Sequence, residues 1–267
     1  MLNSAKWWLG LGWMSLKMRV ASQISYNRWS YFSLFIAQML SYLSDMALVW
    51  AMFRAFQGVD GWSLYQVILL NAIYLMSYGI SQAFTVGLWD SNDLVANGTL
   101  DDYLIRPLNP LVHLMARNFN VGYLSHLTTA IITIAVIYPH LGVAWGVLHW
   151  VFLAVSIIGA SLINAALTIF PAATSFIWTR QSLLSLIQSI RFSFNKYPLG
   201  IYPTVVRIFL TVVIPIAFLN YYPAASLLGK APLALWPLIT LAVGVLMMTA
   251  ALAFWRWGLA RYSSSGS

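Results

Sequence analysis

The sequence has no cysteine, no glutamate and few charged residues of any kind. Without cysteine, neither a disulfide framework nor a thiolate metal site can form. Charged types make up 7% of the 267 residues and hydrophobic types 61%, whereas a soluble domain carries about 25% charged residues. A surface with so little charge cannot mainly contact water. The composition therefore predicts an integral membrane protein, whose solvent is lipid.

The motifs of common catalytic sites are also missing. There is no G-x-x-x-x-G-K-[ST] loop, so the chain is not expected to bind ATP through a phosphate-cradling loop. Neither H-E-x-x-H nor G-x-S-x-G occurs. The four histidines have no metal-ligand spacing between them, so we predict structural roles for them, no metal site and no catalytic residue. These histidines are His113, His126, His140 and His149.

The net charge of +8 does not indicate nucleic-acid binding, because the basic residues stand singly between apolar runs and form no patch. Their distribution instead follows the positive-inside rule. With the N-terminus in the cytoplasm, only Arg54 and Lys230 of the 14 Lys and Arg fall outside. We therefore expect a multi-pass protein of the cell (inner) membrane, with both termini cytoplasmic, lipid as a partner and no nucleic acid. The N-terminus lacks a clean apolar core before a cleavage site, so a cleaved signal peptide is not predicted.

Long stretches without Asp, Glu, Lys or Arg predict six transmembrane helices in an all-α membrane domain covering residues 1–267. About 20 helical residues cross the hydrocarbon core. Helices are favoured over a barrel because the runs are continuously apolar and lipid leaves no partner for free backbone groups. The predicted spans are about 29–53, 64–88, 111–137, 147–176, 203–222 and 233–256, with Pro215 expected to kink the fifth.

Three further segments are too amphipathic or too broken by proline to be simple spans. Residues 13–28 place apolar side chains at helical spacing, which predicts an interfacial helix on the inner leaflet; a cytosolic extension of the first span is the alternative. Residues 180–195 predict a second interfacial helix, or a cytosolic continuation of the fourth span. Residues 218–237 are rich in aromatic residues and proline, which predicts a re-entrant hairpin of short helices on the outer side.

The segment from Asp90 to Pro110 contains four of the six acids of the chain. Gly98 marks a turn. Thr99, followed three residues later by Asp102, resembles a capping box at the start of a short helix, which Pro107 ends. We therefore expect two short helices, joined at the glycine and facing the cytosol.

Five polar residues within the predicted spans are candidates for lining a transport pathway: Asp45, Asn71, Gln82, Asn120 and Asn164. For Asp45 the alternative is a wet position near a helix end, and for the amides it is hydrogen bonding between helices. Because a single acid lies within the spans, the sequence does not favour coupling to an ion gradient. A stripe of small residues around Gly159 predicts close approach of another helix.

Three motifs carry a resemblance to a known family. They are G-T-L-D-D-Y-L-I-R-P-L-N-P at residues 98–110, Y-P-L-G-I-Y-P at residues 197–203, and the stretch from Ile214 to Pro223. Over nearly its full length the chain resembles the permease subunits of type-2 ATP-binding-cassette (ABC) exporters. The resemblance implies six spans, an N-terminal interfacial helix, re-entrant helices after the fifth span, and a coupling helix between the second and third spans.

In that family the coupling helix inserts into a groove on a separate ATPase subunit. Carried over to this chain, the coupling residues are Asp90, Asp93, Leu94, Leu100, Asp101, Asp102, Tyr103, Leu104 and Arg106. The resemblance implies two ABC ATPase subunits and a second permease, in a homo- or heterodimer. ATP and Mg would bind to the ATPase, and no cofactor to this chain. It implies ATP-driven export by alternating access; a gradient-driven secondary transporter is the alternative.

Overall fold

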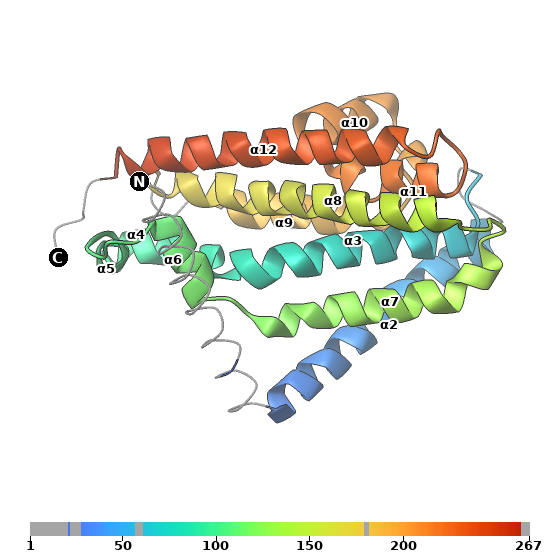
Figure 1. The fold of residues 1–267 in the computed structure, drawn as a ribbon, viewed down its shortest axis with the longest axis horizontal. Coiled ribbons are helices and arrows are strands. Elements are labelled where there is room, and N and C mark those ends of the chain that lie inside the picture. The colour runs from blue at the N-terminus through green and yellow to red at the C-terminus, as the bar shows by residue number, and fades with distance from the viewer. Residues whose placement is uncertain (1–20, 22–27, 57–60, 179–181, 263–267) are drawn as a thin grey trace.

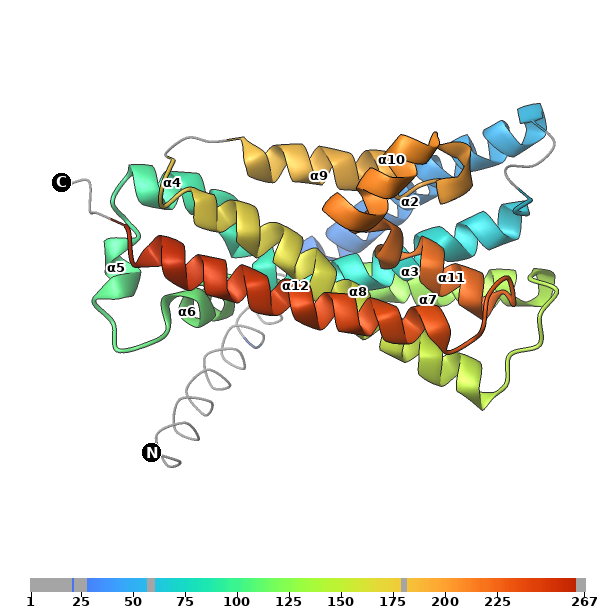
Figure 2. The same cartoon turned by 90° about the horizontal axis from the view of Figure 1, so that it is seen from above.

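The computed structural model describes residues 21, 28–56, 61–178 and 182–262, and long helices side by side dominate it (Figures 1 and 2). Among these residues, five helical stretches are long and apolar enough to cross a membrane. They are Phe35–Phe53, Leu64–Ala96, Val121–His140, Val147–Thr174 and Leu235–Leu259. The all-helical class is therefore confirmed, but five rather than six uninterrupted spans are found in the described part of the chain.

The helices are bounded as follows: α2 Arg28–Phe56, α3 Leu64–Thr85, η1 Val86–Asp90, α4 Ser91–Ala96, α5 Asp101–Leu104, α6 Pro110–Arg117, η2 Val121–Leu124, α7 Ser125–Ile137, η3 Tyr138–His140, α8 Val147–Thr174, α9 Leu183–Phe194, η4 Leu199–Ile201, α10 Thr204–Ile208, η5 Phe209–Val213, η6 Ile216–Leu219, α11 Tyr221–Leu227 and α12 Leu235–Leu259. Figure 1 shows α4, α5 and α6 together at one end of the bundle, and α11 with the start of α12 at the other.

Local sequence signals explain where several helices begin. Ser63 caps α3 in a reciprocal capping box with Gln66, because each side chain accepts a hydrogen bond from the other residue's backbone N–H at 3.3 Å. Asn109 caps α6 by accepting from two backbone N–H groups of its first turn, and Pro110 occupies the first helical position. Gly142, at a φ of 69°, turns the chain between α7 and α8.

The longest helix contact is between α8 and α12, which run side by side (Figure 1). Gly159 of α8 faces Gly244 of α12 so closely that a Cβ added to Gly244 would lie 2.5 Å from the Gly159 carbonyl oxygen. The predicted close approach at Gly159 is therefore confirmed, and α12 is the helix that approaches. Small residues let two backbones come together in this way, which is how helices gain packing energy in lipid.

The predicted third span, 111–137, is not one helix. The chain leaves the helical conformation after α6, and the spanning stretch begins at Val121. Asn120 lies at the break: its backbone N–H donates to the carbonyl of Ala83 on α3 at 3.0 Å, and its side chain accepts from Gly122 N–H at 2.8 Å. Local hydrogen bonds of an asparagine side chain compete with the backbone hydrogen bonds of a helix. Because no charged residue marks this break, the hydropathy of the segment stays high and does not reveal it.

The predicted fifth span, 203–222, is also broken. After α10 the chain forms a π-helical turn, η5, and Ile214 then adopts an extended conformation (φ −122°, ψ 93°). Pro215 explains this, because it lacks an N–H donor and disfavours the helical region for the residue before it. The short helices η6 and α11 follow, mostly buried, where the re-entrant hairpin was predicted. Their position relative to a bilayer stays a prediction.

The helix predicted to lie on the membrane surface at 180–195 packs in the bundle. Described from residue 182, it forms α9, which contacts α8. Its inward side is mixed: Gln188, Arg191 and Leu184 are buried, and Ile187, Ile190 and Phe194 of the predicted apolar stripe pack against a core cluster. The position of α9 relative to a bilayer stays a prediction. The N-terminal interfacial helix predicted at 13–28 falls almost wholly outside the described residues.

Candidate functional sites

The segment that connects η1 to α6 forms the first candidate site, at one end of the bundle (Figure 2). One side of the segment is buried: Val95, Leu100 and Tyr103 belong to an apolar cluster with residues of α6, α8 and α12. Because these side chains are buried, they hold the segment against α6, α8 and α12. A displacement of the segment would therefore also displace the ends of those helices.

Tyr103 connects α5 to α6. Its ring lies 5.1 Å from the ring of His113 and 5.3 Å from the guanidinium carbon of Arg117. Burial lowers the pKa of His113, and the positive charges of Arg106 and Arg117 lower it further. The imidazole is thus held in its neutral form against the tyrosine ring.

The other side of the segment is exposed and combines acidic, basic and apolar groups. Among the nine predicted coupling residues, Leu94 and Asp101 are partly buried, Leu100 and Tyr103 are buried, and the other five are exposed. These five are Asp90, Asp93, Asp102, Leu104 and Arg106. Ile105, which was not predicted, is the most exposed apolar residue there, at 81%. An apolar centre ringed by charges is typical of a docking surface.

The turn within the segment differs from the prediction in one detail. Gly98 has a φ of 69°, as expected of a helix-terminating glycine. Thr99 does not cap α5, however: its hydroxyl donates backwards to the Leu94 carbonyl at 3.4 Å, and no side chain caps α5. The acids at the start of α5 still suit the positive end of a helix. Burial and Asp101 together raise the pKa of Tyr262, which follows α12.

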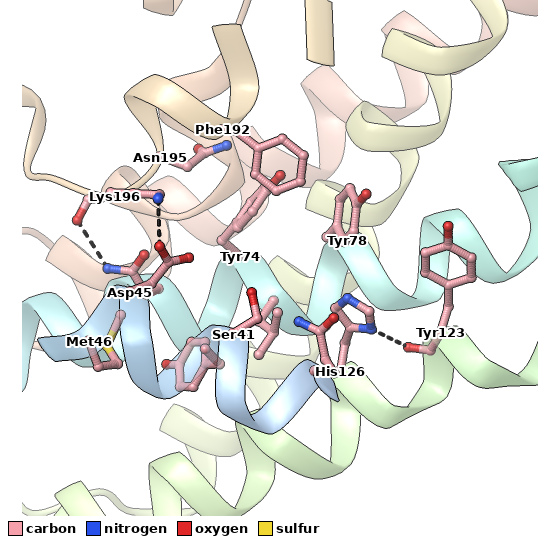
Figure 3. A pocket seen from close by; sticks show the side chains of 14 residues that line it. Ser41, Asp45, Met46, Tyr74, Tyr78, Tyr123, His126, Phe192, Asn195 and Lys196 are labelled. Atoms are coloured by element: carbon pink, nitrogen blue, oxygen red, sulfur yellow. Dashed lines mark hydrogen bonds and ion pairs between the residues drawn. The ribbon is translucent and has the colours of Figure 1, made fainter. Parts of the chain in front are cut away.

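The second candidate site is a cavity of about 300 Å³ among α2, α3, α7 and α9 (Figure 3). Its lining residues are Gln38, Ser41, Tyr42, Asp45, Met46, Asn71, Tyr74, Leu75, Tyr78, Tyr123, His126, Phe192, Asn195 and Lys196. Aromatic, amide and charged side chains thus converge within a bundle of apolar helices. Polar groups are costly among the apolar helices of a membrane protein, so a cluster of them indicates a functional site.

An ion pair stands at one side of this cavity. Lys196 Nζ donates to Asp45 Oδ1 at 2.7 Å, joining the end of α9 to α2 (Figure 3). The side chains of Lys196 and Asp45 are 32% and 39% exposed, so both charges still face open space. Asn71 of α3 positions the lysine by donating to the Lys196 carbonyl at 3.1 Å.

Arg191 lies behind the cavity wall and is fully buried, with 0% exposure. Its guanidinium donates to the backbone carbonyl and the side chain of Asn164, at 3.2 and 3.3 Å, and to Thr168 Oγ1 at 3.5 Å. It also donates to Gln188, which in turn donates to the hydroxyl of the lining residue Tyr78 at 3.0 Å. These partners are all uncharged, so a positive charge is held next to the cavity by neutral acceptors.

The five predicted pathway residues fall in three places. Asp45 and Asn71 line the main cavity, and Asn120 lines a neighbouring one of about 210 Å³ that shares Gln38, Tyr123 and His126 with it. Gln82 and Asn164 line neither: Gln82 donates to Thr168 at 3.4 Å, and Asn164 donates to Ser77 at 3.1 Å, each across a helix interface.

Sequence reasoning missed Lys196 and the aromatic wall. The signal available for Lys196 was a single lysine, directly before Tyr197 and Pro198, in a segment with few other charges. Among the residues that the structure describes, no group of three or more His, Asp or Glu side chains could hold a metal ion.

Comparison with known proteins identifies the family. A family model described as "ABC-2 family transporter protein" matches residues 35–266, a range that includes both candidate sites. This chain belongs to the ABC-2 transporter family. It is therefore a multi-pass membrane protein and a permease subunit of an ABC transporter, not the ATPase itself. No curated protein and no solved structure matches the chain. The resemblance inferred from its sequence motifs is confirmed at the level of the family.

Proposed function

We propose that this ABC-2 permease forms the pathway of an ATP-driven exporter, which a separate ATPase switches between inward-open and outward-open states. Two ATPase subunits would bind ATP and Mg, and a second permease, identical or different, would complete the membrane part. The observation that carries this proposal is the construction of the α4–α5 segment. It offers an exposed surface of charged and apolar groups, and its buried side is fixed to α6, α8 and α12.

That construction suits the transfer of motion from a cytosolic motor. ATP binding closes two ATPase subunits, which would push on Ile105 and its charged neighbours. Because the segment is anchored through Leu100 and Tyr103, the push would reach the ends of α8 and α12 instead of being absorbed in a loose loop. Packed interfaces respond to such a force by changing between discrete arrangements.

The distribution of basic residues supports a cytoplasmic position for this end of the bundle. Arg106 lies in the segment and Arg117 ends α6. Arg256 lies in the last turn of α12 and Arg261 follows that helix, whereas Lys230 lies near α11 at the opposite end. Arg191 and Lys196 no longer contribute to the count, because they lie within the bundle, and Arg207 counts against it, because α10 lies toward the α11 end (Figure 1). The remaining bias still follows the positive-inside rule and favours an inner-membrane protein with a cytoplasmic C-terminus.

Site-specific crosslinking tests the proposed ATPase contact directly. The chain has no cysteine, so Ile105→Cys introduces a single thiol at the centre of the exposed surface. A reagent that joins thiols to amines should connect this variant to the ATPase subunit. His140→Cys, exposed at the opposite end of the bundle, is the matched control and should not be joined to it. Equal crosslinking of both variants, or of neither, would contradict the proposal.

Charge reversal tests whether the contact drives transport. Arg106→Glu should reduce ATP-dependent export by about tenfold or more, since a like-charge contact at an interface costs more than the 1.4 kcal/mol that tenfold requires. Lys230→Glu, at the far end, should leave export within about twofold. The ion pair inside the bundle also makes a gradient-driven carrier a definite alternative. That alternative predicts that an uncoupler stops export while ATP depletion at constant gradient does not.

A further inference from the structure

The cavity lined by Asp45 and Lys196 presents two opposite charges to the same open space. Each is about one-third exposed, and they are paired with each other at 2.7 Å. Within an apolar bundle, a ligand that binds only one of these groups leaves the other without its counter-charge. Removing one partner of a partly buried ion pair is unfavourable, although less so than for a fully buried pair. A ligand with both a positive and a negative group can replace both halves of the pair at once.

One wall of the cavity is aromatic. Tyr74, Tyr78 and Phe192 stand together on the cavity side of α3 and α9, with ring centroids 5.6 Å apart for the tyrosines and 5.8 Å apart for Tyr78 and Phe192 (Figure 3). The same rings pack well against methyl and methylene groups.

The buried Arg191 gives the cavity a polarity. It lies one hydrogen-bonded residue behind Tyr78, and none of the partners found for it is an acid. The charges of Asp45 and Lys196 cancel, so the excess charge around the cavity is positive and sits on the α9 side. An anionic group is therefore favoured next to α9 and Lys196, and a cationic group next to α2 and Asp45.

The size of the cavity limits what can enter it. A volume of about 300 Å³ is at the lower end of ligand pockets, so a headgroup fits but a complete lipid does not. The outer wall is α2, whose other faces expose Leu40, Leu43 and Leu48. A bound headgroup would thus be one helix away from apolar surface suited to an alkyl chain.

We propose that this cavity binds the zwitterionic headgroup of an amphiphile, with its ammonium group at Asp45 and its anionic group at Lys196. This proposal rests on the export function proposed above and assigns it a substrate class. The ion pair between Asp45 and Lys196 is then the contact that the substrate displaces, and amphiphiles with a single charge are rejected because they leave one of the two residues unpaired.

Three probes with the same chain test this selectivity: hexylphosphocholine, hexyltrimethylammonium and hexyl phosphate. The full-length protein in uncharged maltoside micelles should bind hexylphosphocholine with a Kd about tenfold or more below that of the other two. Asp45→Asn should remove the advantage over hexyl phosphate, and Lys196→Gln should remove the advantage over hexyltrimethylammonium. Lys230→Gln, remote from the cavity, should change none of the three Kd values by more than about twofold.

A structural role for the ion pair gives a different result, because each single variant would then weaken all three probes by the same factor. The double variant Asp45→Lys with Lys196→Asp keeps both charges and should keep the preference for the zwitterion. Equal Kd values for the three probes in the wild-type protein, or uniform losses in the variants, would overturn the proposal. ATP hydrolysis by the complex is measured separately. An ATPase that associates but ignores hexylphosphocholine counts against the substrate class, whereas absence of any associated ATPase counts against the export function alone.

Discussion

Replacing Gly244 by alanine tests how tightly α8 and α12 are held together. The added methyl group would lie 2.5 Å from the carbonyl oxygen of Gly159 and 3.2 Å from its Cα atom. Ordinary contacts begin at 3.4 Å, and the obstacle is backbone, which cannot rotate away as a side chain can. The two helices must therefore separate by about 1 Å at their crossing point, a gap at which 6–12 contacts lose a quarter to a half of their energy.

The expected loss of stability is a difference between two effects. Overpacking of a close contact destabilises by roughly 1–3 kcal/mol, and more where backbone is the obstacle. Alanine gains up to about 1 kcal/mol over glycine within a helix, which offsets part of that loss. Because the α8–α12 contact is the most extensive in the bundle, we expect the packing loss to dominate and the free energy of unfolding to fall by about 2 kcal/mol.

Titration with dodecyl sulfate in mixed micelles, followed by circular dichroism, measures this change. Gly146→Ala is the control, because nothing lies within 4 Å of its added methyl group, and its effect should stay below about 1 kcal/mol. Gly159→Ala should resemble Gly244→Ala, since its methyl would lie 2.7 Å from the backbone of Leu241. The double variant should lose less than the sum, because the first methyl has already separated the helices. Strict additivity, or a single variant as stable as the control, would refute the geometry.

Three further predictions concern the α4–α5 segment and the core beneath it. Tyr103→Ala should speed hydrogen exchange in α5 and reduce ATP-driven export, because the packing of the ring against α6 holds the segment in place. Tyr103→Phe keeps the ring, so its exchange rate and its export should equal those of the wild type. Since burial and the two adjacent arginines lower the pKa of His113, its contribution to stability is complete above the ordinary value of 6.5 and is lost as the pH falls below it. The protection of α6 amides against hydrogen exchange, relative to the intrinsic exchange rate at each pH, should therefore fall between pH 7 and pH 5, and His113→Gln should abolish that fall. Gln82→Leu should remove the acceptor that Trp89 Nε1 has at 2.9 Å, and it should lower the unfolding free energy by about 1 kcal/mol. Substrate preference should stay unchanged; an altered preference would assign Gln82 to the transport pathway.

The sequence allowed the long helices to be predicted because hydropathy reports transfer into lipid, residue by residue. Breaks within apolar segments were harder to predict from the sequence. The interruption at Asn120 depends on a backbone bond to α3, a tertiary contact that no window of sequence contains. Pro215 was recognised as a kink, but a kink and a complete break look the same in sequence, and the choice between them depends on what the following short helices pack against.

The candidate cavity was only partly predictable, for an electrostatic reason. Asp45 and Lys196 are 151 residues apart, so neither charge had a visible partner, and the positive-inside rule assigned the lysine to the cytoplasm. Arg191 was misplaced in the same way. The rule treats each basic residue as independently hydrated, and it fails where Asn164, Thr168 or another buried acceptor can replace water.

The two candidate sites are physically continuous, which sequence could not indicate. Arg191 donates to Thr168 of α8, Gln82 of α3 donates to the same hydroxyl at 3.4 Å, and Trp89 of η1 donates back to Gln82 at 2.9 Å. This chain of buried and partly buried hydrogen bonds runs from α9, which Lys196 follows, to the turn that leads directly into α4. Unpaired polar groups are expensive in a lipid-solvated interior, so displacement of one member favours rearrangement of the next over simple rupture. A push on α4 would then tend to move α9 relative to α2, which is the movement that would separate Lys196 from Asp45.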